Sequence, residues 1–148
     1  MPTSKRPERL VVDANAILAA LLGGNARRVF FETAIVEFAV PASVIDEVRA
    51  YLPRLAEKSD VSPTILEFAL DQLPLRVYSR GMYAQAMSEA RRRIARRDPD
   101  DVEVLALTLR LGVPLWSNDR DFEDTTVERF TTAELLRIFF GPSRRGSV

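Results

Sequence analysis

Four acidic residues stand close together in WSNDRDFED, residues 116–124: Asp119, Asp121, Glu123 and Asp124. They follow the apolar GVPL, which predicts the start of a short buried strand. Carboxylates this close repel one another, and a bound divalent cation would relieve the repulsion. Because the chain has no histidine and no cysteine, the ligands of such a cation would be oxygen atoms, which favours Mg²⁺ or Mn²⁺.

Another acid follows an apolar run near the N-terminus. Asp13 ends LVVD, and Asn15 stands two residues later, where a helix rich in Ala and Leu is expected to begin. Open α/β sheets bind ligands at the carboxyl ends of their strands, which is where Asp13 would lie. The alternative is structural, since either residue can act as the N-cap of the helix.

The stretch EFAVPASVIDEV, residues 37–48, repeats this plan. A strand ends at Pro41, Ser43 can cap, and a helix follows. Glu47 lies about one turn into that helix and borders its apolar face, where a carboxylate needs a partner or a metal. The alternative for Asp46 and Glu47 is a favourable interaction with the positive end of the helix.

The stretch DPDDVEVLAL opens a further helix, with Asp98 as a natural N-cap and Pro99 as its first residue. Asp101 is then the third helical residue and lies beside the apolar face. Capping explains Asp101 less well than Asp98, because one cap needs only one such residue. Asp100 and Glu103 are expected to be solvated.

Short apolar runs alternate with segments of helical periodicity along the chain. Strands are predicted at 10–13, 37–40, 75–78, 113–117 and 127–130. Helices are predicted at 15–22, 25–35, 43–57, 62–71, 82–97, 100–111 and 131–140. Strands separated by helices favour right-handed βαβ units, so we expect an α/β fold with a mostly parallel sheet.

A parallel sheet would gather the acids at one of its ends. Asp13, Asp119 and Asp121 follow strands, whereas Glu47 and Asp101 lie in first turns of helices that follow strands or loops. We therefore interpret the acidic stretch as one part of a metal site built from four places in the chain. A purely solvated acidic edge is the alternative.

The composition is that of a folded chain with one domain, residues 1–148, an ordered core at about 10–140 and loose tails at 1–9 and 141–148. Hydrophobic residues make up 47% of the chain, which is enough for a core. No apolar run is long enough to span a membrane and the N-terminus lacks the apolar part of a secretory signal, so we expect a cytoplasmic protein. Without cysteine there are no disulfides or thiol nucleophiles, and without histidine the commonest general base is missing.

The basic residues are almost all arginine, since Lys5 and Lys58 are the only lysines. Guanidinium groups match phosphate oxygens, although a GC-rich genome also enriches arginine. RRRIARR (91–97) and the start of the second helix supply the candidates for substrate binding: Arg27, Arg28, Arg96 and Arg97. The alternative for the last two is an interaction with the negative C-terminal end of a helix.

Four motifs in this order, VVDANAIL, VIDEV, DPDDVEVLAL and SNDRDF, resemble the PIN domain as found in VapC-type toxins of bacteria and archaea. The resemblance spans about residues 10–140. It implies a three-layer α/β fold with a short parallel sheet of order 3-2-1-4-5 flanked by helices. It also implies Mg²⁺- or Mn²⁺-dependent cleavage of RNA, as the toxin component of a type II toxin–antitoxin system.

The resemblance assigns roles to individual residues. The catalytic acidic quartet of the family corresponds to Asp13, Glu47, Asp101 and Asp119. A further acid and two supporting polar residues correspond to Asp121, Asn15 and Ser117. The predicted metal ligands are Asp13, Asp101, Asp119 and Asp121. Ala14 departs from the family pattern, in which Thr or Ser often stands at this position.

The resemblance also predicts three partners, which are an RNA substrate, a cognate antitoxin protein and a second copy of the chain. A homodimer is further indicated by the segment 25–36, whose apolar residues spread more widely than one core face needs: Val29, Phe30, Phe31, Ile35 and Val36. The alternative functions are a catalytically silent PIN-like module that binds RNA or protein, and another aspartate-based α/β enzyme. A phosphoaspartate phosphatase would place a second aspartate where Asn15 stands.

Overall fold

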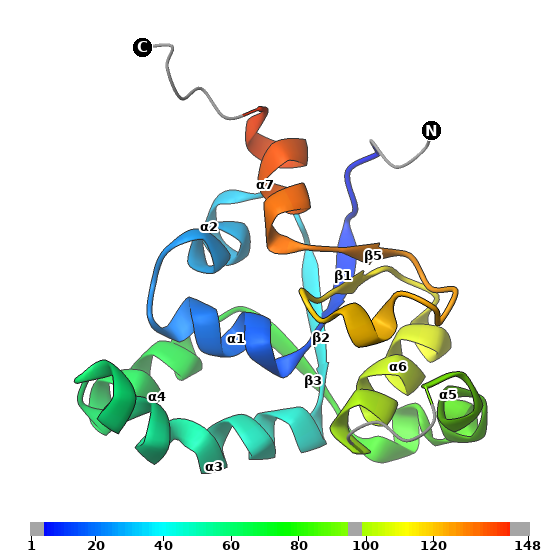
Figure 1. Cartoon of the computed structure of the whole chain (residues 1–148), viewed down its shortest axis with the longest axis horizontal. Helices are drawn as coiled ribbons and strands as arrows, with labels where there is room; N and C mark the ends of the chain where they lie inside the picture. Colours follow the sequence, from blue (N-terminus) through cyan, green and yellow to red (C-terminus); the bar gives the residue numbers. More distant parts are fainter. Residues whose placement is uncertain (1–4, 95–98, 143–148) are drawn as a thin grey trace.

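A short parallel sheet organises the computed structural model, which describes residues 5–94 and 99–142 (Figure 1). Its strands in these residues are β1 (Arg9–Val12), β2 (Glu37–Pro41), β3 (Leu75–Tyr78), β4 (Leu115–Trp116) and β5 (Arg129–Phe130). All neighbouring strands are parallel, and their order is β3-β2-β1-β4-β5. The predicted α/β class and the predicted strand order are therefore confirmed.

Helices cover the sheet. The described α-helices are α1 (Ala14–Leu21), α2 (Asn25–Glu32), α3 (Ala42–Ser59), α4 (Pro63–Gln72), α5 (Met87–Ile94), α6 (Pro99–Leu111) and α7 (Thr132–Phe140). In Figure 1, α1 and α2 lie on one side of the strands and α5 and α6 on the other. None of these helices is long and apolar enough to cross a membrane.

The core lies on both faces of the central strand. Leu10, Val11 and Val12 are fully buried, as expected for a parallel strand that is covered on both faces. On the α2 side, the Phe30 ring lies 4.7 Å from that of Phe38 and 4.9 Å from that of Trp116. On the other side, α6 packs against β1 and β2. This packing fixes the direction of β1 and β4, and so the position of the residues that follow them.

The predicted helix at 82–97 is wrong in its first part. Two 3-10 turns, η2 (Arg80–Met82) and η3 (Ala84–Ala86), precede α5. Tyr83 separates them with φ −130° and ψ 10°, outside the helical region, and its side chain is 1% exposed. Burying this ring with its hydroxyl bonded to another element outweighs the local helical periodicity. Residues 95–98, including the predicted cap Asp98, lie outside the described residues.

Other predicted boundaries also shift. The second helix was predicted to reach residue 35, but α2 ends at Glu32, and β4 and β5 are shorter than predicted. The N-terminal tail was expected to reach residue 9, yet Arg9 already belongs to β1 and the Glu8 carbonyl accepts a hydrogen bond of 2.8 Å from the Val36 amide. These short strands end where the acidic residues begin.

Candidate functional site

A pocket of about 490 Å³ opens at the carboxyl ends of β1 and β4. Its walls come from the start of α1, the second turn of α3, the first turn of α6 and the loop after β4. The polar residues that line it are Asp13, Asn15, Glu47, Asp100, Asp101, Asp119 and Asp121. The structure thus brings together all five acids that the sequence singled out, with Asn15 beside them.

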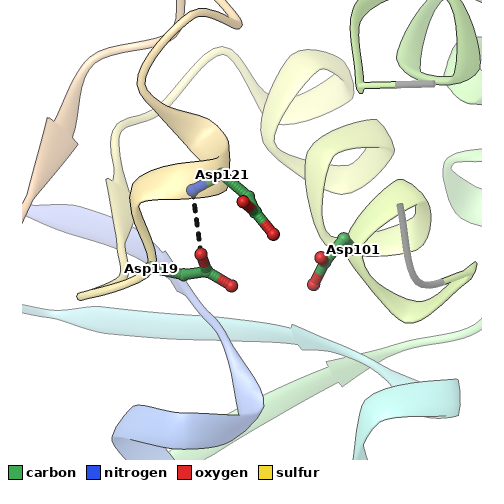
Figure 2. A group of neighbouring side chains, drawn as sticks. All are labelled: Asp101, Asp119 and Asp121. Atoms are coloured by element: carbon green, nitrogen blue, oxygen red, sulfur yellow. Dashed lines mark hydrogen bonds between the residues drawn. The ribbon is translucent and has the colours of Figure 1, made fainter. Parts of the chain in front are cut away.

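Three of these carboxylates point toward one another (Figure 2). Asp101 from α6, and Asp119 and Asp121 from the loop after β4, each offer one oxygen, and these atoms all lie within 4.8 Å of one another. Carboxylate oxygens are the donors that hard divalent cations prefer. The donor set therefore fits Mg²⁺ or Mn²⁺.

Asp13 is the most buried acid of the pocket, with 5% of its surface exposed. It is the N-cap of α1, since one carboxylate oxygen accepts a hydrogen bond of 3.1 Å from the Ala16 amide. The other oxygen accepts a hydrogen bond from the Ser117 hydroxyl. Burial raises the pKa of Asp13 despite these two bonds, and the nearby Asp119 carboxylate adds to the rise. A cation in the pocket would offset this cost of ionising Asp13.

Ser117 links the two strand ends. Its hydroxyl donates to Asp13 and accepts a hydrogen bond of 2.9 Å from the Asp119 amide. Asp119 in turn accepts, through its carboxylate, a bond of 2.8 Å from the Asp121 amide, the dashed line in Figure 2. One chain of hydrogen bonds therefore sets the relative positions of three predicted ligands.

Comparison with known families gives one match. Residues 11–138, most of the chain, match the PIN domain. The chain belongs to the PIN domain family. PIN domains are in general nucleases and typically bind divalent metals. No curated protein matches the chain.

Glu47 of this PIN domain is more exposed than the sequence predicted. Its side chain was expected to border the buried core. It is instead exposed and forms part of the pocket wall on α3. The helix begins at Ala42 with Pro41 at the N-cap, and neither Ser43 nor any other side chain caps it. Asp46 and Glu47 consequently lie beyond the first turn, where the helix dipole has little effect on them. Asn15, also considered as a cap, is an exposed residue inside α1.

Two acids of α6 were wrongly expected to be solvated. Asp100 is half-buried and lines the pocket. Glu103 accepts a hydrogen bond from the buried Tyr83 hydroxyl and lies 3.7 Å from the Arg80 guanidinium. Burial, reinforced by Glu103, raises the pKa of Tyr83 to about 12, so this hydroxyl stays protonated at neutral pH. The pair anchors α6 to the turns before α5.

The loop that carries Asp119 and Asp121 is also held from behind. The Arg129 guanidinium on β5 donates a bond of 2.8 Å to the Ser117 carbonyl and lies 3.6 Å from Glu123. The side-chain amide oxygen Oδ1 of Asn118 accepts a bond of 2.9 Å from the Thr132 backbone amide at the start of α7. Sequence reasoning missed both contacts, and only the predicted strand around Arg129 hinted that this residue would lie beside β4.

The predicted substrate-binding arginines are not brought to the pocket. Arg27 donates to the carbonyls of Ala20 and Leu21 at the far end of α1, at 3.1 and 3.2 Å. Arg28 pairs with Glu32 and lies 4.2 Å from the centre of the Phe140 ring. Neither lines the acidic pocket. Arg96 and Arg97 lie outside the described residues.

Proposed function

We propose that this PIN domain is an endoribonuclease that depends on Mg²⁺ or Mn²⁺. The observation that carries the proposal is the convergence of the Asp101, Asp119 and Asp121 oxygens within 4.8 Å of one another. Asp13 and Glu47 line the same pocket, so a phosphodiester entering it meets five carboxylates. Cations that reduce this negative charge would favour the entry of a polyanion.

The residues divide the work as follows. Asp101, Asp119 and Asp121 would hold the metal, with Asp13 behind them as the buried acid whose ionised form the metal would favour. When bound, the metal would stabilise charge on the scissile phosphate and lower the pKa of a water molecule. Ser117 keeps Asp13 and Asp119 in register through its hydroxyl.

Proton transfer would fall to a carboxylate, because the chain has no histidine. Glu47 is exposed on the wall of the pocket, from which its carboxylate can accept a proton from the attacking water. Asn15 stands on α1 at the same pocket and can donate its amide hydrogens to a phosphate oxygen. Ala14 supplies no hydroxyl, so Asp13 depends on Ser117 and the Ala16 amide for support.

We extend the proposal to the role of the protein in the cell: it acts on RNA as a toxin, is paired with a protein antitoxin and forms a homodimer. Phe31 and Val36, exposed by 52% and 75%, support the dimer, whereas Val29, Phe30 and Ile35 are buried in the core. The face is smaller than the sequence indicated, since Val36 lies beyond the end of α2.

Sedimentation at micromolar concentration tests the homodimer, and a species of 16.7 kDa alone contradicts it. A neighbouring reading frame for a small DNA-binding protein, and inhibition by its product, would support the toxin role.

The nuclease itself is tested with Asp121→Asn, using Asp124→Asn in the same loop as the matched control. Both residues are exposed, but only Asp121 lines the pocket. We expect the purified chain to cleave a mixed RNA pool with Mn²⁺ but not with EDTA, Asp121→Asn to lose most of this activity, and Asp124→Asn to keep it. Metal-independent cleavage contradicts the proposal. No cleavage by the wild type with metal present and any bound partner removed favours the silent binding module.

A further inference from the structure

A second pocket adjoins the acidic one and runs between α1 and α3. The two pockets share Ala14, Asn15 and Glu47, so they form one continuous depression. Its far part is lined by Tyr51 and Arg54 of α3. We call this second part, from Glu47 to Arg54, the α1–α3 groove; the two helices that form it lie side by side in Figure 1.

One face of α3 changes from acidic to aromatic to basic along and beyond this groove. Glu47, Tyr51, Arg54 and Lys58 follow at intervals of four, three and four residues, which places them on one face of the helix. This stripe extends over roughly 16 Å from the acidic pocket. It begins with an acid, continues with an aromatic ring and ends with two cations. The Lys58 ammonium donates a bond of 3.0 Å to the Tyr51 hydroxyl, so the ring and the charge form one unit.

The two cations of the stripe differ from the other basic residues around these helices. Arg27 and Arg28 have carbonyl or carboxylate partners, and Arg49 on the same helix α3 lies 3.8 Å from Asp71. Neither Arg54 nor Lys58 forms an ion pair with an acid within residues 5–94 and 99–142. Arg54 therefore presents its charge in the groove, and Lys58 is exposed one turn beyond the groove's lining residues.

We propose that the α1–α3 groove binds the single-stranded RNA that flanks the scissile phosphate. A base stacks on Tyr51 while Arg54 and Lys58 contact backbone phosphates, the combination that proteins use for single strands. This inference rests on the proposed function for the identity of the strand. The charge pattern favours RNA over a protein segment, because cations and an aromatic ring continue outward from a pocket for a phosphate.

The first test measures the affinity of a fluorescein-labelled single-stranded RNA oligonucleotide at several salt concentrations, in metal-free buffer so that nothing is cut. Each phosphate contact contributes about 0.7 to the slope of log K against log salt. We expect Arg54→Gln to reduce the slope by about 0.7 and Arg54→Gln with Lys58→Gln by about 1.4. Arg49→Gln, on the same helix but outside the groove, should leave the slope unchanged. Equal slopes for the wild type and the double variant, or no binding by the wild type at low salt, overturn the inference.

The second test concerns Tyr51, which packs partly against the core. Tyr51→Phe keeps the ring and Tyr51→Leu keeps an apolar side chain without a flat face, so both preserve packing. Stacking on an aromatic ring contributes enough that its loss weakens binding roughly 5- to 100-fold. We expect that loss for Tyr51→Leu and near wild-type affinity for Tyr51→Phe. Equal affinity of the two variants, with both folded by circular dichroism, contradicts stacking.

A cleavage assay separates this inference from the proposed nuclease. Arg54→Gln should raise KM for a long RNA and leave kcat unchanged, since the flank binds equally in the ground and transition states. With RNA shortened on the groove side, the variant and the wild type should have the same KM. If the wild type cleaves RNA and Arg54→Gln shares its KM on long RNA, the groove fails and the nuclease stands. If the wild type binds through the groove but never cleaves with metal, the nuclease fails and the groove stands.

Discussion

Two carboxylates on the same sheet have opposite electrostatic surroundings. Glu37 starts β2 and Asp13 follows the end of β1, so they lie at opposite ends of neighbouring strands. Burial raises the pKa of Glu37, but hydrogen bonds from Tyr78 and Arg9 and the charge of Arg76 outweigh it and lower this pKa. Burial also raises the pKa of Asp13, and there the neighbouring charge is another acid, Asp119.

The difference distinguishes Glu37, an acid with partners inside the fold, from Asp13, an acid of the candidate site. Glu37 has cationic partners within the fold, with the Arg9 guanidinium at 2.6 Å, so its charge is neutralised locally. Asp13 forms no ion pair with any of the described residues. A cation in the pocket would offset the cost of ionising Asp13, whereas Glu37 already has arginine partners.

The largest expected effect is on cleavage, through Asp13→Asn. Asparagine is also a good N-cap and can accept the Ala16 hydrogen bond, so the fold should persist. We expect RNA cleavage to fall by several orders of magnitude, because metal-assisted steps depend on the position and charge of every ligand. Stability at neutral pH without metal should stay equal or rise, since the variant has no buried charge to desolvate. If Asp13→Asn cleaves RNA like the wild type, Asp13 has no role in the proposed reaction and its contrast with Glu37 is purely structural.

The next effect concerns Arg129, which contacts the acidic loop from behind. Arg129→Gln removes the bond to the Ser117 carbonyl and loosens the loop that carries Asp119. Residues that orient ligands in this way typically change metal affinity 10- to 100-fold, and we expect a loss of that size for Mn²⁺ by calorimetry. Arg120→Gln is the control, because Arg120 also lies near Glu123, at 3.5 Å, but it is exposed, and the Ser117 carbonyl accepts its hydrogen bond from Arg129 instead. Equal Mn²⁺ affinity in the two variants would remove the positioning role of Arg129.

Local sequence was sufficient to predict which acids follow strands. LVVD and VPLWS marked the ends of β1 and β4, and parallel pairing then gathered Asp13 and Asp119 without any knowledge of contacts. The polar support of Asp13 by Ser117 came from the resemblance alone. Local periodicity overestimated the burial of Glu47. A helix face that borders the core can equally border a pocket.

Long-range partners were beyond the sequence. Periodicity predicted a continuous helix where Tyr83, bonded to Glu103, interrupts it. The bonds from Arg129 and Thr132 to the acidic loop depend on how β5 and α7 pack beside β4. Arg27 was expected at the substrate because it is basic, yet it caps carbonyls at the end of α1. Side chains with several possible partners are placed by tertiary packing, which no local pattern encodes.

A smaller effect is expected at the structural end of the comparison. Glu37→Gln weakens the contacts with Arg9 and Arg76 and leaves a largely buried site, since the Glu37 side chain is 13% exposed. We expect the free energy of unfolding to fall by roughly 1–3 kcal/mol in urea titrations, the usual size for hydrogen bonds to charged groups. Cleavage should be unchanged once the variant is folded. A loss of kcat comparable to that of Asp13→Asn would show that the two ends of the sheet are not independent.

The smallest effect is the pH dependence of these two variants, measured by urea unfolding in metal-free buffer. The folded pKa of Asp13 is raised above its ordinary value of 3.8 by burial. As pH rises past 3.8, the unfolded chain releases this proton first, so the wild type loses stability until the folded pKa is passed. Asp13→Asn lacks this loss, and its stability relative to the wild type should therefore increase as pH rises from below 3.8 toward neutrality.

For Glu37 the sign is opposite, because hydrogen bonds from Tyr78 and Arg9 hold its folded pKa below the ordinary 4.5. Its contribution to stability is complete above pH 4.5 and is lost as pH falls through the folded pKa. The cost of Glu37→Gln should thus be greatest near neutral pH and shrink in acid, while the relative gain of Asp13→Asn shrinks in acid as well. The wild type and Asp13→Asn should converge below pH 3.8, where Asp13 is protonated in both the folded and the unfolded chain. The wild type and Glu37→Gln should converge only after the pH has fallen below the lowered folded pKa of Glu37. A cost of Glu37→Gln that grows on acidification would mean that its arginine contacts do not stabilise the fold, and the contrast between the two ends of the sheet would have to be abandoned.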